Sequence, residues 1–199
     1  MGSIGNAKLM KPLLTWEEVL ELVAQARNEG LGVTNFFPDE VRMSAWCRDG
    51  VFYGVRYGDT QFFVRRQPTF SNVCFVSRSA GALGEDWKTF ASKNGNGKWI
   101  VDLIGPDRVR QPLEDTMSSV GFSRLTTLQR MGRKTPEDVA EFSPDMEHAT
   151  LDDAEKIKEL LDAHFIAEEE QIPSLEEIRK WIGIQSLFVM RGGAVNSID

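Results

Sequence analysis

Three short stretches rich in aromatic and β-branched residues follow one another in the middle of the chain: Val51–Tyr57, Gln61–Arg66 and Asn72–Ser77. This composition is typical of β-strands. The Gly58-Asp59 pair between the first two stretches is a two-residue hairpin signal, so we expect antiparallel pairing. A fourth stretch, Val41–Cys47, runs into Asp49-Gly50, and it predicts one more strand and hairpin. The chain must therefore build a mainly antiparallel sheet around these residues.

Helical patterns flank this strand-rich region. Thr15 and Glu18 have the form of a capping box, and apolar residues then recur at helical spacing until Gly30. After Ser77 the pattern alternates between helix and strand. We predict a helix over 85–93, a central strand over 98–104, a helix over 108–120 and a last strand over 124–131.

The end of the chain has a different organisation. Thr150 and Asp153 predict the start of one amphipathic helix, and Ser174 with Glu177 predicts the start of another. The apolar run Leu187–Met190 follows. We therefore divide the chain into a flexible segment over 1–12, a domain over 13–134, a linker over 135–146 and an incomplete second domain over 147–199.

Charge is distributed unevenly between these parts. Residues 1–135 carry 18 basic and 14 acidic side chains, whereas residues 136–199 carry 5 and 16. A mildly basic domain followed by an acidic end does not resemble a nucleic-acid binder, which concentrates Lys and Arg on one face. A small anionic ligand would suit the basic excess of the first part.

The remaining composition excludes several classes of protein. The chain contains two cysteines, Cys47 and Cys74, and two histidines, His148 and His164, without the spacing of metal ligands. We expect no metal site, buried thiols rather than nucleophiles, and a reducing, cytoplasmic location. No apolar run approaches the length of a membrane span, so we expect no membrane partner.

The order of these elements resembles the GNAT N-acetyltransferase superfamily over roughly residues 13–133. Helices, antiparallel strands, a strand–helix–strand unit, a helix and then Gly121-Phe122 follow one another as in that superfamily. The resemblance implies an α/β (α+β) fold: a mixed, mostly antiparallel central sheet flanked by helices, here followed by a C-terminal pair of helices. It also implies acetyl-CoA as cofactor, a small-molecule or peptide amine as acceptor, and transfer of an acetyl group.

The cofactor's pyrophosphate would lie on the loop after Ser77. The superfamily pattern [Q/R]-x-x-G-x-[G/A] aligns with Arg78, Ser79, Ala80 and Gly81, which the resemblance makes cofactor-binding residues. Leu83 stands where the superfamily has Gly or Ala, and its side chain is expected to crowd a phosphate. The transferase prediction requires an open gap between neighbouring strands beside this loop. The alternative is a glycine-containing loop without a ligand.

The catalytic residues are not identified by the resemblance. Met117 stands where many members have a tyrosine that protonates the departing thiolate, and a thioether cannot donate a proton. Asp39, Glu40 and Asp102 are candidate general bases, each equally readable as an ordinary surface or strand-end carboxylate.

A second resemblance concerns the end of the chain. The phrase Ala149-Thr-Leu-Asp-Asp-Ala-Glu-Lys-Ile157, with the two helices and the apolar run, resembles the opening of another GNAT domain. Two functions stay open: an acetyl-CoA-dependent N-acyltransferase, active or inactive in this chain, and a non-catalytic module that packs on an active copy or partner. Self-association through residues 147–199 is expected if their apolar faces need a cover.

Overall fold

We describe the protein from a computed structural model, which defines residues 10–95, 97–127, 146–170, 172–191 and 195–198. The chain divides into an N-terminal unit, residues 1–123, and a C-terminal unit, residues 124–199. The predicted linker over 135–146 lies outside the described residues except for Met146. Within the described ranges, no helix combines the length and the apolar character needed to cross a membrane.

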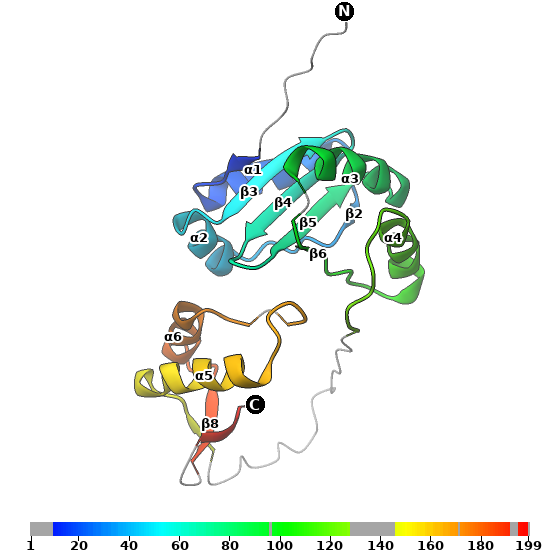
Figure 1. Ribbon diagram of the computed structural model, residues 1–199. Helices are drawn as coiled ribbons and strands as arrows, with labels where there is room; N and C mark the ends of the chain where they lie inside the picture. Colours follow the sequence, from blue (N-terminus) through cyan, green and yellow to red (C-terminus); the bar gives the residue numbers. More distant parts are fainter. Residues whose placement is uncertain (1–9, 96, 128–145, 171, 192–194, 199) are drawn as a thin grey trace, which may run out of the picture. The chain divides into compact units, whose positions relative to one another are not determined.

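The N-terminal unit is built on a six-stranded, mostly antiparallel sheet (Figure 1). Its strands are β1 (Lys11–Pro12), β2 (Val33–Thr34), β3 (Phe52–Tyr57), β4 (Thr60–Arg66), β5 (Ser71–Ser77) and β6 (Trp99–Ile100). The spatial order is β1-β3-β4-β5-β2, and β6 pairs in parallel with the opening residues of β5. The three strands predicted over 51–77 and the Gly58-Asp59 hairpin are confirmed.

Helices cover both faces of this sheet. They are α1 (Trp16–Asn28), α2 (Glu40–Arg48), α3 (Ala80–Asn94) and α4 (Asp107–Ser119). The side chains of β4 alternate, so that Phe63 packs with α1 and α2 while Phe62 packs with α3 and α4. The unit therefore has two hydrophobic cores, one on each side of the sheet. A mixed fold of this kind was predicted.

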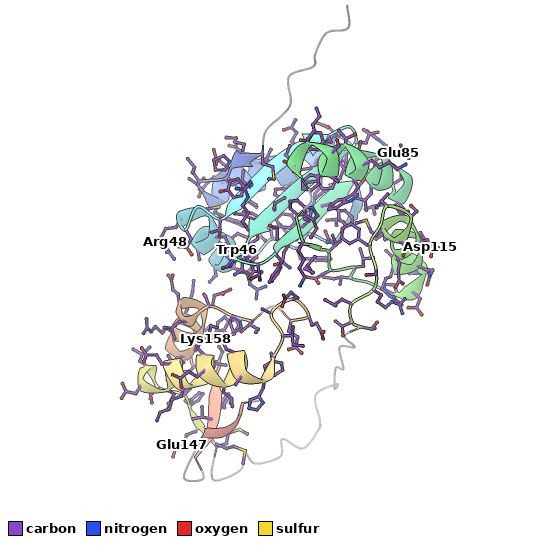
Figure 2. All side chains as sticks on the ribbon, viewed as in Figure 1. Trp46, Arg48, Glu85, Asp115, Glu147 and Lys158 are labelled. Carbon is purple, nitrogen blue, oxygen red and sulfur yellow. The ribbon has the colours of Figure 1, made fainter. Side chains whose placement is uncertain are left out.

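The strand predicted over Val41–Cys47 is wrong, because these residues lie in helix α2. The Asp39 carboxylate accepts the Arg42 amide at 2.8 Å and caps the helix. The buried residues Met43 and Cys47 are four apart, which is helical spacing. Trp46 (labelled in Figure 2) packs edge-on against Phe52, with ring centroids 5.4 Å apart.

Two further strand predictions also differ from the structure. The run Lys98–Ile104 is not a central strand, since only Trp99 and Ile100 pair, on the outer edge of β5. Of the last predicted strand, residues 124–127 form no strand and 128–131 lie outside the described residues. Asp49 and Gly50 end α2 instead of forming a hairpin. Lys11 and Pro12, within the segment expected to be flexible, pair with β3.

The C-terminal unit contains a three-stranded antiparallel sheet and two helices. The strands are β7 (Met146–His148), β8 (Phe188–Arg191) and β9 (Val195–Ile198), in the order β7-β8-β9. A short 3-10 turn, Leu151–Asp153, leads into α5 (Ala154–His164), and α6 is Leu175–Gly183. Both predicted capping boxes are present, at Thr150 and at Ser174. Ile157, Ile178 and Val189 form the centre of the core between helices and sheet.

Candidate functional site

The predicted pyrophosphate loop connects β5 to the N-terminus of α3. Ser79 caps α3, and its hydroxyl accepts the Ala82 amide at 3.1 Å. Within an α-helix, each amide donates to the carbonyl four residues before it. The amides of Ala80 and Gly81 lie at the start of α3, where no helical carbonyl precedes them, so they have no partner within the helix. Ser79 and Gly81 are exposed and Ala80 is partly buried. The four residues Arg78–Gly81 thus present a helix N-terminus to solvent, with the positive end of the helix dipole.

Arg78 is held by an acidic partner from the β3–β4 turn. Its guanidinium contacts both carboxylate oxygens of Asp59, each at 3.1 Å, and the Arg78 amide donates to the Asp59 carbonyl. This hydrogen-bonded pair lowers the pKa of Asp59 and raises the pKa of Arg78. An anion at α3 would therefore have to compete with a carboxylate already bound to Arg78.

Asp86 of α3 fixes the same turn from the other side. Its carboxylate accepts the Asp59 amide at 2.9 Å. Gly58 has a φ of 45°, and a Cβ placed there would collide with the Asp86 carboxylate. Partial burial raises the pKa of Asp86, opposed by hydrogen bonds from Thr60 and the Asp59 amide. These contacts give Asp86 a structural role at the turn.

The outer edge of β5, beside the loop, is filled by the chain itself. Strand β2 pairs with the last residues of β5, Val33 with Ser77 and Thr34 with Val76. The Thr34 hydroxyl donates to the Phe75 carbonyl at 2.7 Å. The gap that the transferase prediction requires between neighbouring strands is therefore occupied at this end of β5.

Asn35 occupies the part of the β5 edge that lies between β2 and β6. Its carboxamide accepts the Phe75 amide at 2.7 Å and donates to the Val73 carbonyl at 3.3 Å and the Asp102 carbonyl at 2.8 Å. The residue is 4% exposed. Asn35 thus replaces strand pairing on β5 and ties the segment after β6 to it. Sequence reasoning missed this residue, since β2 is two residues long and its partner lies about forty residues away.

Leu83 and Met117 both lie in the core and not on the loop. Leu83 is fully buried against the aromatic residues of α3 and the sheet, so its side chain does not cover the exposed turn at Ala80 and Gly81. The expectation that Leu83 crowds a phosphate is therefore wrong. Met117 is 3% exposed in the same core, where a tyrosine hydroxyl would lack water.

The candidate general bases are not brought together. Asp39 caps α2, Glu40 lies in the first turn of that helix, and Asp102 follows β6. Cys74 is partly buried in β5, and desolvation raises the pKa of its thiol to about 12, which leaves it protonated at neutral pH. No catalytic group is assembled at Arg78–Gly81 from these residues.

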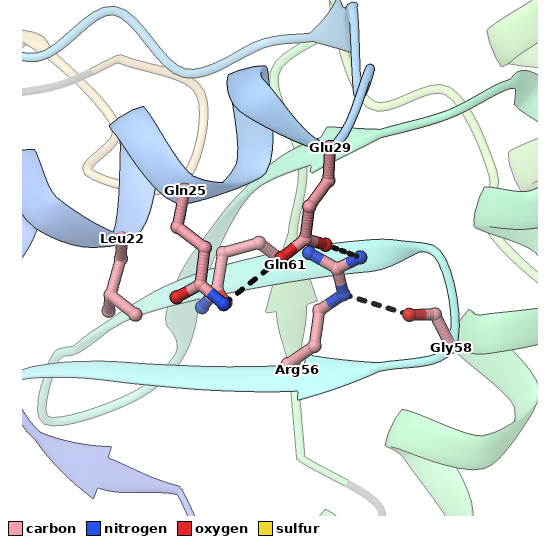
Figure 3. A pocket seen from close by; sticks show the side chains of 6 residues that line it. All are labelled: Leu22, Gln25, Glu29, Arg56, Gly58 and Gln61. Atoms are coloured by element: carbon pink, nitrogen blue, oxygen red, sulfur yellow. Dashed lines mark hydrogen bonds and ion pairs between the residues drawn. The ribbon is translucent and has the colours of Figure 1, made fainter.

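A polar pocket of about 410 Å³ lies where α1 crosses the β3–β4 hairpin (Figure 3). It is lined by Leu22, Gln25, Glu29, Arg56, Gly58 and Gln61. Arg56 forms an ion pair with Glu29, at 2.9 Å between Nη2 and Oε2. The sequence offered one signal for it: Gln61 is a polar residue directly before the apolar run Phe62–Val64 of the same strand.

Comparisons with protein-family models, with curated proteins and with solved structures each found no match. Among the described residues, no group of three or more histidine, cysteine or acidic side chains could hold a metal ion. What this protein does must therefore be argued from its own residues.

Proposed function

We propose that the N-terminal unit is a GNAT-like domain that acts as a non-catalytic module. The element order supports the GNAT-like part of this proposal. The antiparallel strands β3, β4 and β5 precede α3 in the chain, and β6 follows it. Strands β5 and β6 pair in parallel. Helix α3 begins directly after β5, at the loop where the resemblance implies a pyrophosphate.

The non-catalytic part of the proposal rests on the edge of β5, which the chain itself occupies. A cofactor whose diphosphate sits at α3 must extend its acyl arm to an acceptor, and the superfamily resemblance requires an open gap there. Here Asn35 and Thr34 already bond the backbone of Val73 and Phe75. A ligand at this edge would have to break these buried hydrogen bonds, each costing about 1–3 kcal/mol if left unsatisfied.

The test is a titration of the full chain with acetyl-CoA, read as melting temperature and as acetylation of added amines. A ligand at one hundred times its Kd stabilises a protein by about 2.7 kcal/mol, so specific binding is readily seen. We expect no shift at millimolar acetyl-CoA and no turnover. A shift that saturates, or any enzymatic acetyl transfer, would contradict the proposal.

The second candidate is the acetyl-CoA-dependent N-acyltransferase, which transfers an acetyl group to an amine. The exposed helix start at Ser79, Ala80 and Gly81, beside Arg78, favours it. If acetyl-CoA does bind there, Gly81→Glu should abolish the thermal shift by charge repulsion at the helix start. Val109→Glu is the matched control, because it adds the same charge to the exposed first turn of α4.

We also propose that the C-terminal unit is the start of a second GNAT-like domain and that it mediates self-association. Its order of strand, helix, helix, strand, strand matches the opening of the N-terminal unit apart from the two-residue strand β2. Ile166 and Ile184 are 57% and 67% exposed, and apolar side chains of this size favour a protein partner. Light scattering should give a mass that rises with concentration for the full chain and falls in Ile166→Asp and Ile184→Asp. Leu14→Asp, in the N-terminal unit, is the matched control, since Leu14 is also 63% exposed.

A further inference from the structure

The pocket between α1 and the β3–β4 hairpin is built from residues that the sheet and helix fix in place (Figure 3). Arg56 and Gln61 are opposite each other in the β3–β4 register, and Glu29 follows the end of α1. Gly54 allows the close approach of Leu22, because a Cβ there would lie 3.0 Å from Leu22 Cδ1. Leu22 thereby forms one apolar wall of an otherwise polar pocket.

Gln61 leaves one hydrogen-bonding atom unused in this pocket. Its Nε2 donates to the Val55 carbonyl at 3.2 Å and the Phe62 carbonyl at 3.0 Å, which fixes the orientation of the amide. Among the described residues, none donates to Gln61 Oε1, and the residue as a whole is 4% exposed. In the part of the chain that the structure describes, the buried side-chain atoms without a partner do not include Gln61 Oε1, so this oxygen is reached by solvent and can accept from a molecule in the pocket.

Arg56 and Glu29 offer opposite charges beside that oxygen. Arg56 Nε donates to the Gly58 carbonyl at 2.8 Å and Nη2 donates to Glu29, while Nη1 has no partner among the described residues. Gln25 Nε2 donates to the other Glu29 oxygen at 3.0 Å. The Arg56 side chain is 21% exposed and that of Glu29 is 41% exposed, so both ends of the ion pair remain accessible.

We propose that this pocket binds a small zwitterion of the α-amino acid class. The ligand carboxylate accepts from Arg56 Nη1, and the ligand ammonium donates to Glu29 and to Gln61 Oε1. An apolar side chain on the ligand contacts Leu22. The volume of about 410 Å³ lies within the range of small-molecule sites. The lining residues are not those of the Arg78–Gly81 loop, so this site does not depend on the proposed function.

The experiment is an NMR titration of the isotope-labelled full chain with L-leucine. We expect saturable shifts at the amides of Gln25, Arg56 and Gln61. N-acetyl-L-leucine lacks the ammonium and L-leucinamide lacks the carboxylate, and each should bind about tenfold more weakly or worse, because one charge-assisted hydrogen bond to Glu29 or Arg56 is then lost. Equal binding of either analogue, shifts that do not saturate, or shifts spread over the whole unit would overturn the proposal.

Two variants separate a ligand site from a structural ion pair. Glu29→Gln keeps the shape of an accessible side chain, so it should fold and lose about tenfold in affinity for L-leucine. The same variant frees Arg56 and should bind N-acetyl-L-leucine as well as or better than the wild type. Gln61→Met should weaken L-leucine binding, whereas Gln111→Met, on the exposed surface of α4, should not. Unchanged L-leucine affinity in Glu29→Gln would overturn the proposal even if Gln61→Met failed to fold.

Discussion

The N-terminal and C-terminal units begin with the same arrangement of elements and then differ. In each, a short strand precedes two helices and two antiparallel strands, and these strands have the same sheet order: β1-β3-β4 in one and β7-β8-β9 in the other. The N-terminal unit also has the two-residue strand β2 between its two helices. The N-terminal unit continues with β5, α3, β6 and α4. The common part therefore forms one helical layer on one sheet face, and only the continuation supplies a second layer.

The two sheets show what this second layer contributes. In the N-terminal unit, the α3–α4 side holds eleven buried residues and the α1–α2 side another eleven. Among its described side chains, the C-terminal unit has one cluster of six, around Ile157 and Ile178. On the opposite face of its sheet, Phe188 and Met190 are only partly buried. Because apolar burial dominates stability, the C-terminal unit should be the less stable of the two.

The largest expected effect comes from removing the contact between the second layer and the sheet. Leu83→Ala opens a cavity in the α3–α4 core, and we expect the free energy of unfolding of the N-terminal unit to fall by about 3 kcal/mol. Hydrogen exchange measured by mass spectrometry should show faster exchange in α3 and β4 and unchanged exchange in α5 and α6. Leu20→Ala is the control, since Leu20 is 43% exposed on α1. Loss of protection in α5 and α6 at the same denaturant concentration would show that the units unfold together.

Asn35 should give the next largest effect, because the described part of the shorter sheet shows no counterpart to it. Asn35→Ala leaves the Phe75 amide and the Val73 and Asp102 carbonyls without this partner. We expect a loss of about 2 kcal/mol in urea unfolding, less than three full hydrogen-bond penalties because water can enter beside β6. Asn28→Ala, at the exposed end of α1, should change stability by less than about 0.5 kcal/mol. Equal effects of the two substitutions would mean that Asn35 does not hold the edge of β5.

The contrast between caps and Asn35 also explains which parts of the fold could be predicted from the sequence. Thr15, Ser174 and the Gly58-Asp59 turn act on residues within a few positions, so a local pattern reveals them. Helix α2 was missed because its aromatic and β-branched residues suggested a strand, although Met43 and Cys47 and the Asp39 cap carried the helical signal.

The candidate site was predictable only in its local part. A helix after β5 was predicted over 85–93 from neighbouring residues, whereas its cap at Ser79 and its start at Ala80 were not. The partner of Arg78 and the occupant of the β5 edge come from segments about twenty to forty residues away, and no spacing rule indicates them. The apolar composition of the run Lys98–Ile104 predicted a full strand. Only its first residues pair with β5, because Asn35 occupies the Val73 carbonyl, and the composition of the run does not show this.

A smaller effect should separate the two units through their helix caps. Ser174→Ala removes the hydroxyl that accepts the Glu177 amide at 3.2 Å, and Thr15→Ala removes the one that accepts the Glu18 amide at 3.3 Å. Each costs about 1 kcal/mol. Because the C-terminal unit has the smaller core, we expect Ser174→Ala to speed hydrogen exchange across α5 and α6, and Thr15→Ala to affect only the first turn of α1. A wider response to Thr15→Ala would reverse the order of stability argued above.

The smallest effect concerns Arg78, at the loop that the C-terminal unit lacks among its described residues. Hydrogen bonding from Arg78 lowers the pKa of Asp59, so Arg78→Ala should raise that pKa toward its ordinary value. A carboxyl with a lowered pKa in the folded state contributes stability at pH values above its unfolded pKa, and the contribution is lost as the pH falls through the folded pKa. The wild type and Arg78→Ala should thus differ slightly at neutral pH and converge in acid. The difference is small because both side chains are about half exposed.

Carbon-detected NMR titration of the Asp59 carboxyl measures the pKa directly, with Lys88→Ala, whose partner is Glu85, as control. An unchanged Asp59 pKa in Arg78→Ala would mean that Arg78 is not bound by this carboxylate in solution and is available to an anion at α3.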